Sequence, residues 1–452
     1  MPTIFAEQAL LTDGWAADVR ITFEGGTISA VSTGAARAGD DAQVAVAVPG
    51  IASLHSHAFQ RGMAGLAEVR GATADTFWTW REVMYRFALS MSPEDAEAVA
   101  TYLYCEMLEA GFTRVGEFHY LHHDRDGRTY ANVAEMAERI AASAAASGIG
   151  LTLLPCFYAH ATFGGAPPHD GQRRFICDVD LFARLHDASR TALRGLDGAN
   201  IGVAPHSLRA VTPEELKAVT EIGSGGVVHI HAAEQVKEVE DCFKWSFKRP
   251  VQWLLENMPV GDKWCLIHAT HMTDEETRRL AETGAVAGLC PMTEGSLGDG
   301  VFPALDFLSD GGRFGIGTDS NVLVGVTDEL RQLEYAQRLK YRERNVLAGS
   351  AKVSTGRALF DAALAGGAQA LDQDACGIAE GCTADIVALD GTHPSIAGRR
   401  GDAILDGWIF ASARNAVSRV WARGREVVTD GRHIARTTAQ ARFNSAVGRL
   451  LA

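Results

Sequence analysis

The chain has 452 residues, a formal net charge of −14 at pH 7, 47% hydrophobic residues and 22% charged residues. This length allows one large domain with a small one, or up to about three domains, and the apolar content is sufficient for a sizeable core. The acidic balance argues against nucleic-acid binding, which normally depends on a basic surface. We therefore expect no nucleic-acid partner.

Targeting and membrane signals are absent from the pattern of residues. The N-terminal stretch lacks the basic and apolar regions of a signal peptide. Residues 141–168 carry no charge, but Ser, Gly, Thr, His and Pro interrupt them, as at a helix end followed by a buried strand. The eight cysteines are scattered and form no C-x-x-C pair, which is typical of reduced cysteines. These features predict a cytoplasmic protein without membrane association.

Residues 1–47 contain short alternating stretches, such as Val19–Phe23 and Thr27–Val31, separated by glycine pairs. Alternation with turn residues between the stretches predicts β-hairpins. The N-terminal residues are therefore expected to form strands of a small β domain.

The middle of the chain repeats a short apolar strand, a polar loop and an amphipathic helix. The predicted strands are Val48–Leu54, Arg114–Tyr120, Ile149–Tyr158, Ile201–His206, Gly226–His231, Lys263–His268, Ala285–Cys290 and Arg313–Gly317. Thr212 and Thr273 precede acidic first-turn residues, which is typical of helix N-caps. Eight such units indicate an α/β protein with a closed (β/α)8 TIM-like barrel. A doubly wound open sheet is the alternative, but no G-x-G-x-x-G motif follows the first strand.

Two longer helices are expected next, around Asp328–Val346 and Thr355–Leu371. Hairpin signals then return, for example in Ala384–Leu389 and Val417–Val428. Both chain ends are thus expected to build one β-sandwich domain beside the barrel. The predicted domains are a small β domain over residues 1–47 and 374–440, a barrel over residues 48–373, and a helical C-terminal tail over residues 441–452.

Histidines and acids gather at the predicted carboxyl ends of the strands, where (β/α)8 barrels carry their active sites. These rim residues are His55, His57, His206, Arg209, His229, His231, Glu234, His268, His271 and Asp319. Alternate residues of a strand share a face, so His55 and His57 point the same way. The pair alone fits a metal site or two hydrogen-bonded core histidines, and the rim as a whole favours the metal.

Imidazoles combined with a carboxylate suit zinc or ferrous iron better than calcium or magnesium. A divalent metal in such a site lowers the pKa of bound water to near neutral. Glu234 lies three residues beyond His231 and is placed to move a proton to a leaving group. Taken alone, Glu234 is equally an ordinary acid at a helix start.

Four motifs resemble the amidohydrolase superfamily and, within it, the single-metal deaminases. They are P-G-I-A-S-L-H-S-H (residues 49–57), H-A-A-E (231–234), H-A-T-H (268–271) and G-T-D-S (317–320). The resemblance implies one divalent metal, zinc or iron, bound by His55, His57, His231 and Asp319. It also implies that Glu234, His268 and Asp319 are catalytic. Residues 200–209 contain no lysine, which disfavours the two-metal branch with its bridging lysine on strand four.

Within this branch, longer segments are most similar to the formiminoglutamate deiminases. These segments are L-H-S-H-A-F-Q-R-G-M-A-G, E-F-H-Y-L-H-H, A-P-H-S-L-R-A-V and C-P-M-T-E-G-S-L-G-D-G. The resemblance implies hydrolysis of N-formimino-L-glutamate to N-formyl-L-glutamate and ammonia, a step of histidine degradation, by a homodimer. It assigns the glutamate part of this dicarboxylate substrate to Gln60, Arg81, Tyr120, His206 and Arg209.

Other interpretations stay open for the substrate and for these five residues. A purine site would want aromatic stackers, whereas Arg81 and Arg209 suit carboxylates, which guanidinium groups bind with two parallel hydrogen bonds. Both arginines could instead lie on the surface, Tyr120 could pack at the rim, and His206 could only support a neighbour. The alternative functions are a guanine, cytosine or S-adenosylhomocysteine type deaminase with the same metal core and, more remotely, a non-catalytic scaffold.

Overall fold

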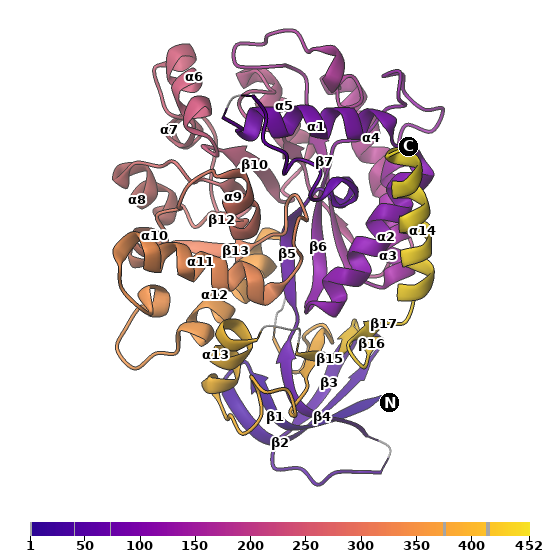
Figure 1. Ribbon diagram of the computed structural model, residues 1–452, viewed down its shortest axis with the longest axis vertical. Helices are drawn as coiled ribbons and strands as arrows, with labels where there is room; N and C mark the ends of the chain where they lie inside the picture. The colour runs from indigo at the N-terminus through magenta and orange to yellow at the C-terminus, as the bar shows by residue number, and fades with distance from the viewer. Residues whose placement is uncertain (1, 40, 73, 374–376, 413–415) are drawn as a thin grey trace.

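The computed structural model describes residues 2–39, 41–72, 74–373, 377–412 and 416–452 (Figure 1). The strands are β1 Thr3–Leu11, β2 Gly14–Glu24, β3 Thr27–Ser32, β4 Ala42–Pro49, β5 Ile51–Ser56, β6 Phe112–His119, β7 Gly150–Phe157, β8 Asn200–Ile201, β9 Ala204–Pro205, β10 Val228–Ala232, β11 Trp264–His268, β12 Val286–Leu289, β13 Arg313–Ile316, β14 Ile386–Leu389, β15 Val417–Ala422, β16 Arg425–Thr429 and β17 Arg432–His433. The α-helices are α1 Phe77–Ser90, α2 Pro93–Glu109, α3 Glu135–Ser147, α4 Val179–Ala192, α5 Pro213–Ile222, α6 Val236–Ser246, α7 Pro250–Asn257, α8 Asp274–Glu282, α9 Pro291–Leu297, α10 Ala304–Ser309, α11 Val326–Tyr341, α12 Thr355–Ala370, α13 Asp402–Ala411 and α14 Arg436–Leu450. Three short 3-10 helices complete the set: η1 Ala58–Met63, η2 Asp170–Gln172 and η3 Val346–Ala348.

The strands from β5 to β13 form a closed parallel ring, so the predicted (β/α)8 barrel is confirmed. One arc pairs β5, β6, β7 and β8, and the other pairs β10, β11, β12 and β13. Parallel bridges between Val203 and Val228 and between Ser56 and Asp319 join the two arcs. Leu54, Ile267 and Val286 belong to one buried cluster of barrel-strand residues. The interior of the barrel is therefore a packed core, and the carboxyl ends of its strands form the face on which barrels of this kind carry their active sites.

Two predicted strands are each interrupted at a glycine that packs too closely against a neighbour to carry a side chain. The strand expected over Val48–Leu54 changes sheet at Gly50, between β4 and β5. A Cβ on Gly50 would lie 2.3 Å from Thr113, so only glycine fits where the chain enters the barrel. The strand expected over Ile201–His206 divides into β8 and β9 at Gly202 and Val203, where a Cβ on Gly202 would lie 2.5 Å from the Val227 carbonyl oxygen.

Both chain ends contribute to one eight-stranded sheet, as the sequence predicts. Its order is β17-β16-β15-β14-β4-β1-β2-β3, so the C-terminal strands join the N-terminal ones at the β14–β4 pair. Ile21 and Phe23 share a buried cluster with Ile386 and Trp421, so the two halves of the sheet cover a common core. Figure 1 shows this domain at the end of the molecule opposite to α1.

The C-terminal helix differs in extent from the predicted tail, and the predicted domain boundary at Asp374 lies outside the described residues. Helix α14 begins at Arg436, not at residue 441, and runs along α2 (Figure 1). Arg436 forms an ion pair with Glu109 of α2 at 2.9 Å, and Phe443 stacks on Tyr102 with the ring centroids 4.3 Å apart. The tail is thus part of the barrel's helical layer.

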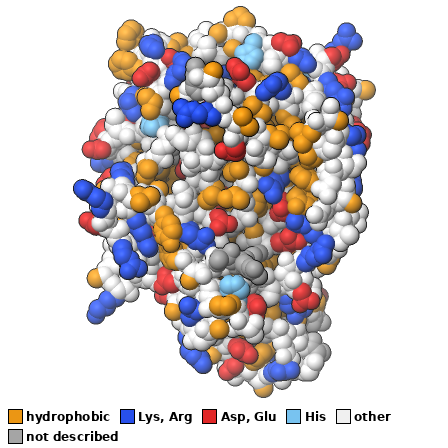
Figure 2. All heavy atoms as spheres, in the orientation of Figure 1, with side chains coloured by type: hydrophobic (Ala, Val, Ile, Leu, Met, Phe, Trp, Pro, Cys, Tyr) orange, Lys and Arg blue, Asp and Glu red, His pale blue; other side chains and the backbone are white. Residues whose placement is uncertain are grey.

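The surface bears on which partners the protein can have. On the face in Figure 2, basic and acidic side chains are interspersed, and neither sign forms a continuous surface. Among the helices of the described residues, none combines the length and the apolar character that crossing a bilayer requires.

Candidate metal centre and active site

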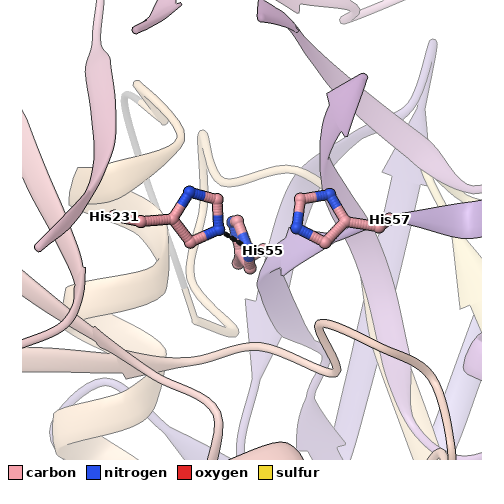
Figure 3. A group of neighbouring side chains, drawn as sticks. All are labelled: His55, His57 and His231. Atoms are coloured by element: carbon pink, nitrogen blue, oxygen red, sulfur yellow. Dashed lines mark hydrogen bonds between the residues drawn. The ribbon is translucent and has the colours of Figure 1, made fainter. Parts of the chain in front are cut away.

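Three imidazoles converge at the carboxyl ends of the barrel strands. His55 and His57 come from the end of β5 and His231 from β10, and Figure 3 shows their rings pointing toward one another. Nε2 of His55 lies 3.1 Å from Nε2 of His231. All three side chains are buried, and their ligand atoms lie within 4.8 Å of one another. This cluster is therefore a candidate metal site.

The other ring nitrogens fix how two of these imidazoles are presented. Nδ1 of His57 lies 2.9 Å from the Phe118 carbonyl, and Nδ1 of His231 lies 2.9 Å from the His206 carbonyl. A carbonyl only accepts, so each Nδ1 donates and each Nε2 keeps a lone pair directed at its neighbours. Burial also lowers the pKa of both histidines, which keeps them neutral. Anchored, neutral imidazoles of this kind are typical of metal ligands.

Asp319, which follows β13 and bridges to Ser56 at the end of β5, adds a carboxylate to the three imidazoles. Its Oδ1 lies 3.5 Å from Nε2 of His55 and 3.4 Å from Nε2 of His57. Its backbone φ of 43° lies in the left-handed region, which a non-glycine residue occupies at some cost and often at functional sites. Three imidazole nitrogens and one carboxylate form a donor set that fits zinc or ferrous iron.

Glu234 and His268 lie beside this cluster. Nε2 of His268 is 3.7 Å from Oε1 of Glu234 and 3.7 Å from Oδ2 of Asp319. Burial raises the pKa of Glu234 to about 7, so the carboxyl can both hold and release a proton near neutral pH. Burial opposes a charge on His268, but the carboxylates of Glu234, Glu294 and Asp319 outweigh it and raise the pKa of His268 to about 10.

His229 takes no part in the cluster. His229 lies two residues before His231, so strand alternation places the two side chains on one face and not on opposite faces. The Nε2 of His229 nevertheless lies 2.8 Å from the Ala370 carbonyl at the end of α12. The residue therefore belongs to the packing between barrel and helix.

The five residues that the resemblance assigns to the substrate line a single cavity with the metal cluster. This cavity is lined by Gln60, Arg81, Tyr120, His206 and Arg209 together with His57, His231, Glu234, His268 and Asp319. Gln60 donates from Nε2 to the Tyr120 hydroxyl at 2.7 Å, which fixes the amide against the ring. The structure thus brings together the predicted metal, catalytic and substrate residues, whereas His229 and His271 do not line this cavity.

Arg209 is the most unusual residue of this cavity. Its side chain is only 5% exposed, and Nε and Nη2 have no hydrogen-bond partner among the described residues. Its nearest acid, Glu234, keeps Oε2 3.9 Å from Nη2, beyond hydrogen-bond distance. A buried guanidinium with unused donors is costly unless a ligand supplies acceptors. The cavity is therefore suited to an anionic group.

Sequence reasoning missed the aromatic wall that α1 adds to the cavity. Phe77, Trp80 and Tyr85 line it, and the Arg81 guanidinium lies 4.6 Å from the centre of the Trp78 ring. The argument that a purine site would be recognised by aromatic side chains therefore does not separate the alternatives, because this cavity has both aromatics and arginines. The sequence pointed to Arg81, but it did not indicate that the aromatic side chains beside Arg81 would line the cavity.

Sequence reasoning also missed Glu294, which lies within the recognised segment C-P-M-T-E-G. Its Oε1 is 3.3 Å from Nδ1 of His268. No spacing in the sequence links these two positions, which are 26 residues apart.

The chain belongs to the amidohydrolase family, whose model matches residues 46–427. Residues 1–44 match a second family model, described as the N-terminal domain of formimidoylglutamate deiminase HutF. The chain is 51% identical to formimidoylglutamate deiminase of Pseudomonas aeruginosa, over the full length of both proteins. It is 29% identical to 8-oxoguanine deaminase of the same organism, over 67% of this chain and 66% of that one.

Solved structures agree with this assignment. An amidohydrolase from Brucella melitensis is 60% identical, with a TM-score of 0.97 and complete coverage of both chains. An adenosine deaminase from Xanthomonas campestris with bound zinc has a TM-score of 0.81 at 22% identity, covering 99% of this chain and 98% of that one, and shares the fold.

Proposed function

We propose that this protein hydrolyses N-formimino-L-glutamate to N-formyl-L-glutamate and ammonia, a step of histidine degradation. The observation that carries this proposal is the buried Arg209, which has two unpartnered nitrogens and lines a cavity together with His57, His231 and Asp319. A dicarboxylate supplies the acceptors that these donors lack. The full-length similarity to a formimidoylglutamate deiminase supports the same substrate.

The resident metal is proposed to be a single zinc ion, with ferrous iron as the alternative. His55, His57, His231 and Asp319 would hold it, because their donor atoms converge and suit either ion. Such an ion lowers the pKa of water at the site to near neutral.

The cavity residues have separate roles in the proposed hydrolysis. Gln60, Tyr120, His206 and the two arginines orient the glutamate part, so that the formimino carbon lies near the cluster. Asp319 and His268 orient the attacking water, whose oxygen bonds to that carbon. Glu234 takes one proton of this water and delivers it to the terminal nitrogen, which gives a tetrahedral intermediate that keeps a hydroxyl group. Glu234 then moves the hydroxyl proton to the same nitrogen, the C–N bond breaks, and ammonia leaves. The carbon retains the oxygen as the formyl group.

The direct test is ammonia release by the zinc-loaded protein from N-formimino-L-glutamate, compared with guanine, cytosine and S-adenosylhomocysteine. We expect turnover of the first compound alone. Preferential turnover of a heterocycle would overturn the substrate assignment. Absence of stoichiometric metal, together with no turnover of any compound, would favour the scaffold alternative.

A cytoplasmic location and a homodimer are proposed as well. Cys105, Cys156, Cys177, Cys242, Cys265 and Cys290 are free, buried thiols, which supports a reducing compartment. Light scattering of the purified protein tests the dimer, and fractionation of the source cells tests the location.

A further inference from the structure

We infer that Glu294 is a positioning residue, which holds the His268 imidazole so that Nε2 and not Nδ1 faces Glu234 and Asp319. Oε1 of Glu294 lies 3.3 Å from Nδ1 of His268. A carboxylate only accepts hydrogen bonds, so Nδ1 carries the proton that the two residues share. The opposite ring atom, Nε2, is then the one presented to the site, 3.7 Å from each of the two catalytic carboxylates.

Glu294 is itself rigidly held. It lies in α9, which starts at Pro291 directly after β12, and its side chain is buried. Oε1 also accepts from the Cys290 backbone N–H at 2.9 Å, and the Glu294 N–H donates to the Cys290 carbonyl at 2.9 Å. The carboxylate is thus hydrogen-bonded to the backbone at the end of a barrel strand, so it can hold the imidazole in one orientation.

His268 depends on this contact because its stacking on His231, with the ring centroids 5.7 Å apart, sets the ring plane but not which nitrogen points into the site. Its φ of 68°, followed by 49° at Ala269, places it in a left-handed turn at the end of β11. The contacts of Nε2 at 3.7 Å are too long for hydrogen bonds. In the described part of the chain, Glu294 supplies the ring's one hydrogen bond. A half-turn of the ring exchanges Nδ1 for a carbon atom, so losing this bond would misplace the catalytic nitrogen.

The test compares Glu294→Ala, Glu294→Gln and Glu329→Gln as metal-loaded proteins, with N-formimino-L-glutamate as substrate. Glutamine keeps an acceptor oxygen for Nδ1–H, whereas alanine removes it. Glu329 is a matched control, because it is a fully buried acid of α11 that accepts the Met292 N–H of α9 at 2.9 Å without reaching His268. It controls for disturbance of α9 by the replacement of a buried carboxyl group.

We expect Glu294→Ala to lower kcat by about 100-fold, as misplacement of a reacting group by about 1 Å does, with KM within about twofold of the parent. Glu294→Gln and Glu329→Gln should each stay within about tenfold of the parent kcat, because neither removes the acceptor. A crystal structure of Glu294→Ala should show the His268 ring rotated or in two orientations. The inference is wrong if Glu294→Ala keeps its kcat, if either glutamine variant loses as much as alanine, or if the ring stays unchanged in the crystal.

This inference rests on the proposed function only for the choice of substrate. If the parent protein fails to turn over N-formimino-L-glutamate, the proposed function fails by itself. The orientation of His268 in the alanine variant still decides the role of Glu294, because that measurement needs no substrate.

Discussion

Replacing Arg209 by methionine should weaken the capture of a dicarboxylate while leaving the metal cluster in place. Arg209 is 5% exposed, and two of its guanidinium nitrogens, Nε and Nη2, have no partners among the described residues. Each hydrogen bond to a charged group contributes about 1.5–3 kcal/mol. Two bonds at the lower limit give about 3 kcal/mol, which corresponds to a loss in kcat/KM of roughly 150-fold. Methionine has a similar length and no donors, so it removes the bonds with little change in packing.

The assay should include two analogues that each lack one carboxylate, N-formimino-4-aminobutyrate and N-formimino-L-2-aminobutyrate. If Arg209 binds one of the two carboxylates, the loss caused by Arg209→Met should vanish for the analogue that lacks it, as in a double-mutant cycle. An equal loss for all three compounds would show that Arg209 acts on the protein and not on the substrate. An unchanged kcat/KM for the parent substrate would refute the reasoning altogether.

Three further outcomes follow from the structure. Glu234→Gln should retain stoichiometric metal but lose about 10²–10⁴-fold in kcat, because it no longer transfers a proton; turnover at the parent rate would exclude that role. Removal of metal by a chelator should lower Tm, because about 4 kcal/mol of stability is lost when free metal was at 1,000 times its Kd. The Tm of His55→Ala, which already lacks a ligand, should drop less. Burial raises the pKa of the Glu117 carboxyl to about 8 in the folded protein, far above its ordinary value, so the folded state binds more protons and loses stability as pH rises from about 4.5 to 8. Thermal melts of Glu117→Gln should fall less than those of the parent over this window, and parallel curves for the two proteins would contradict the assignment.

The sequence predicts the barrel and its rim well, because both depend on local patterns. Apolar strands that end in histidines or acids place His55, His231 and Asp319 at one edge, whatever the helices between them do. The pairing of the two chain ends in one sheet was also predictable, since each end carries hairpin signals.

What the sequence left out depends on contacts between distant elements. Glu294 reaches His268 because α9 follows β12, which pairs with the strand β11 that ends at His268. No periodicity in the sequence predicts a contact between these two positions. The aromatic wall of α1 acquires its role from the way that helix lies over the barrel rim. The division of strand four lies at Gly202, whose close approach to the Val227 carbonyl can be recognised only once the neighbouring strand is placed.

The seam of the barrel has a consequence for how the protein is made. Asp319 donates its backbone N–H to the His55 carbonyl, and its own carbonyl accepts from the His57 N–H, each at 3.0 Å, so the barrel closes between the proposed metal ligands. The first ligands emerge from the ribosome early, but their partner follows more than 260 residues later. The complete four-ligand site therefore exists only after the last barrel strand has been synthesised and docked. Assembly of the proposed four-ligand site is thus a late event that requires the last barrel strand, and a protein truncated before residue 319 lacks this site.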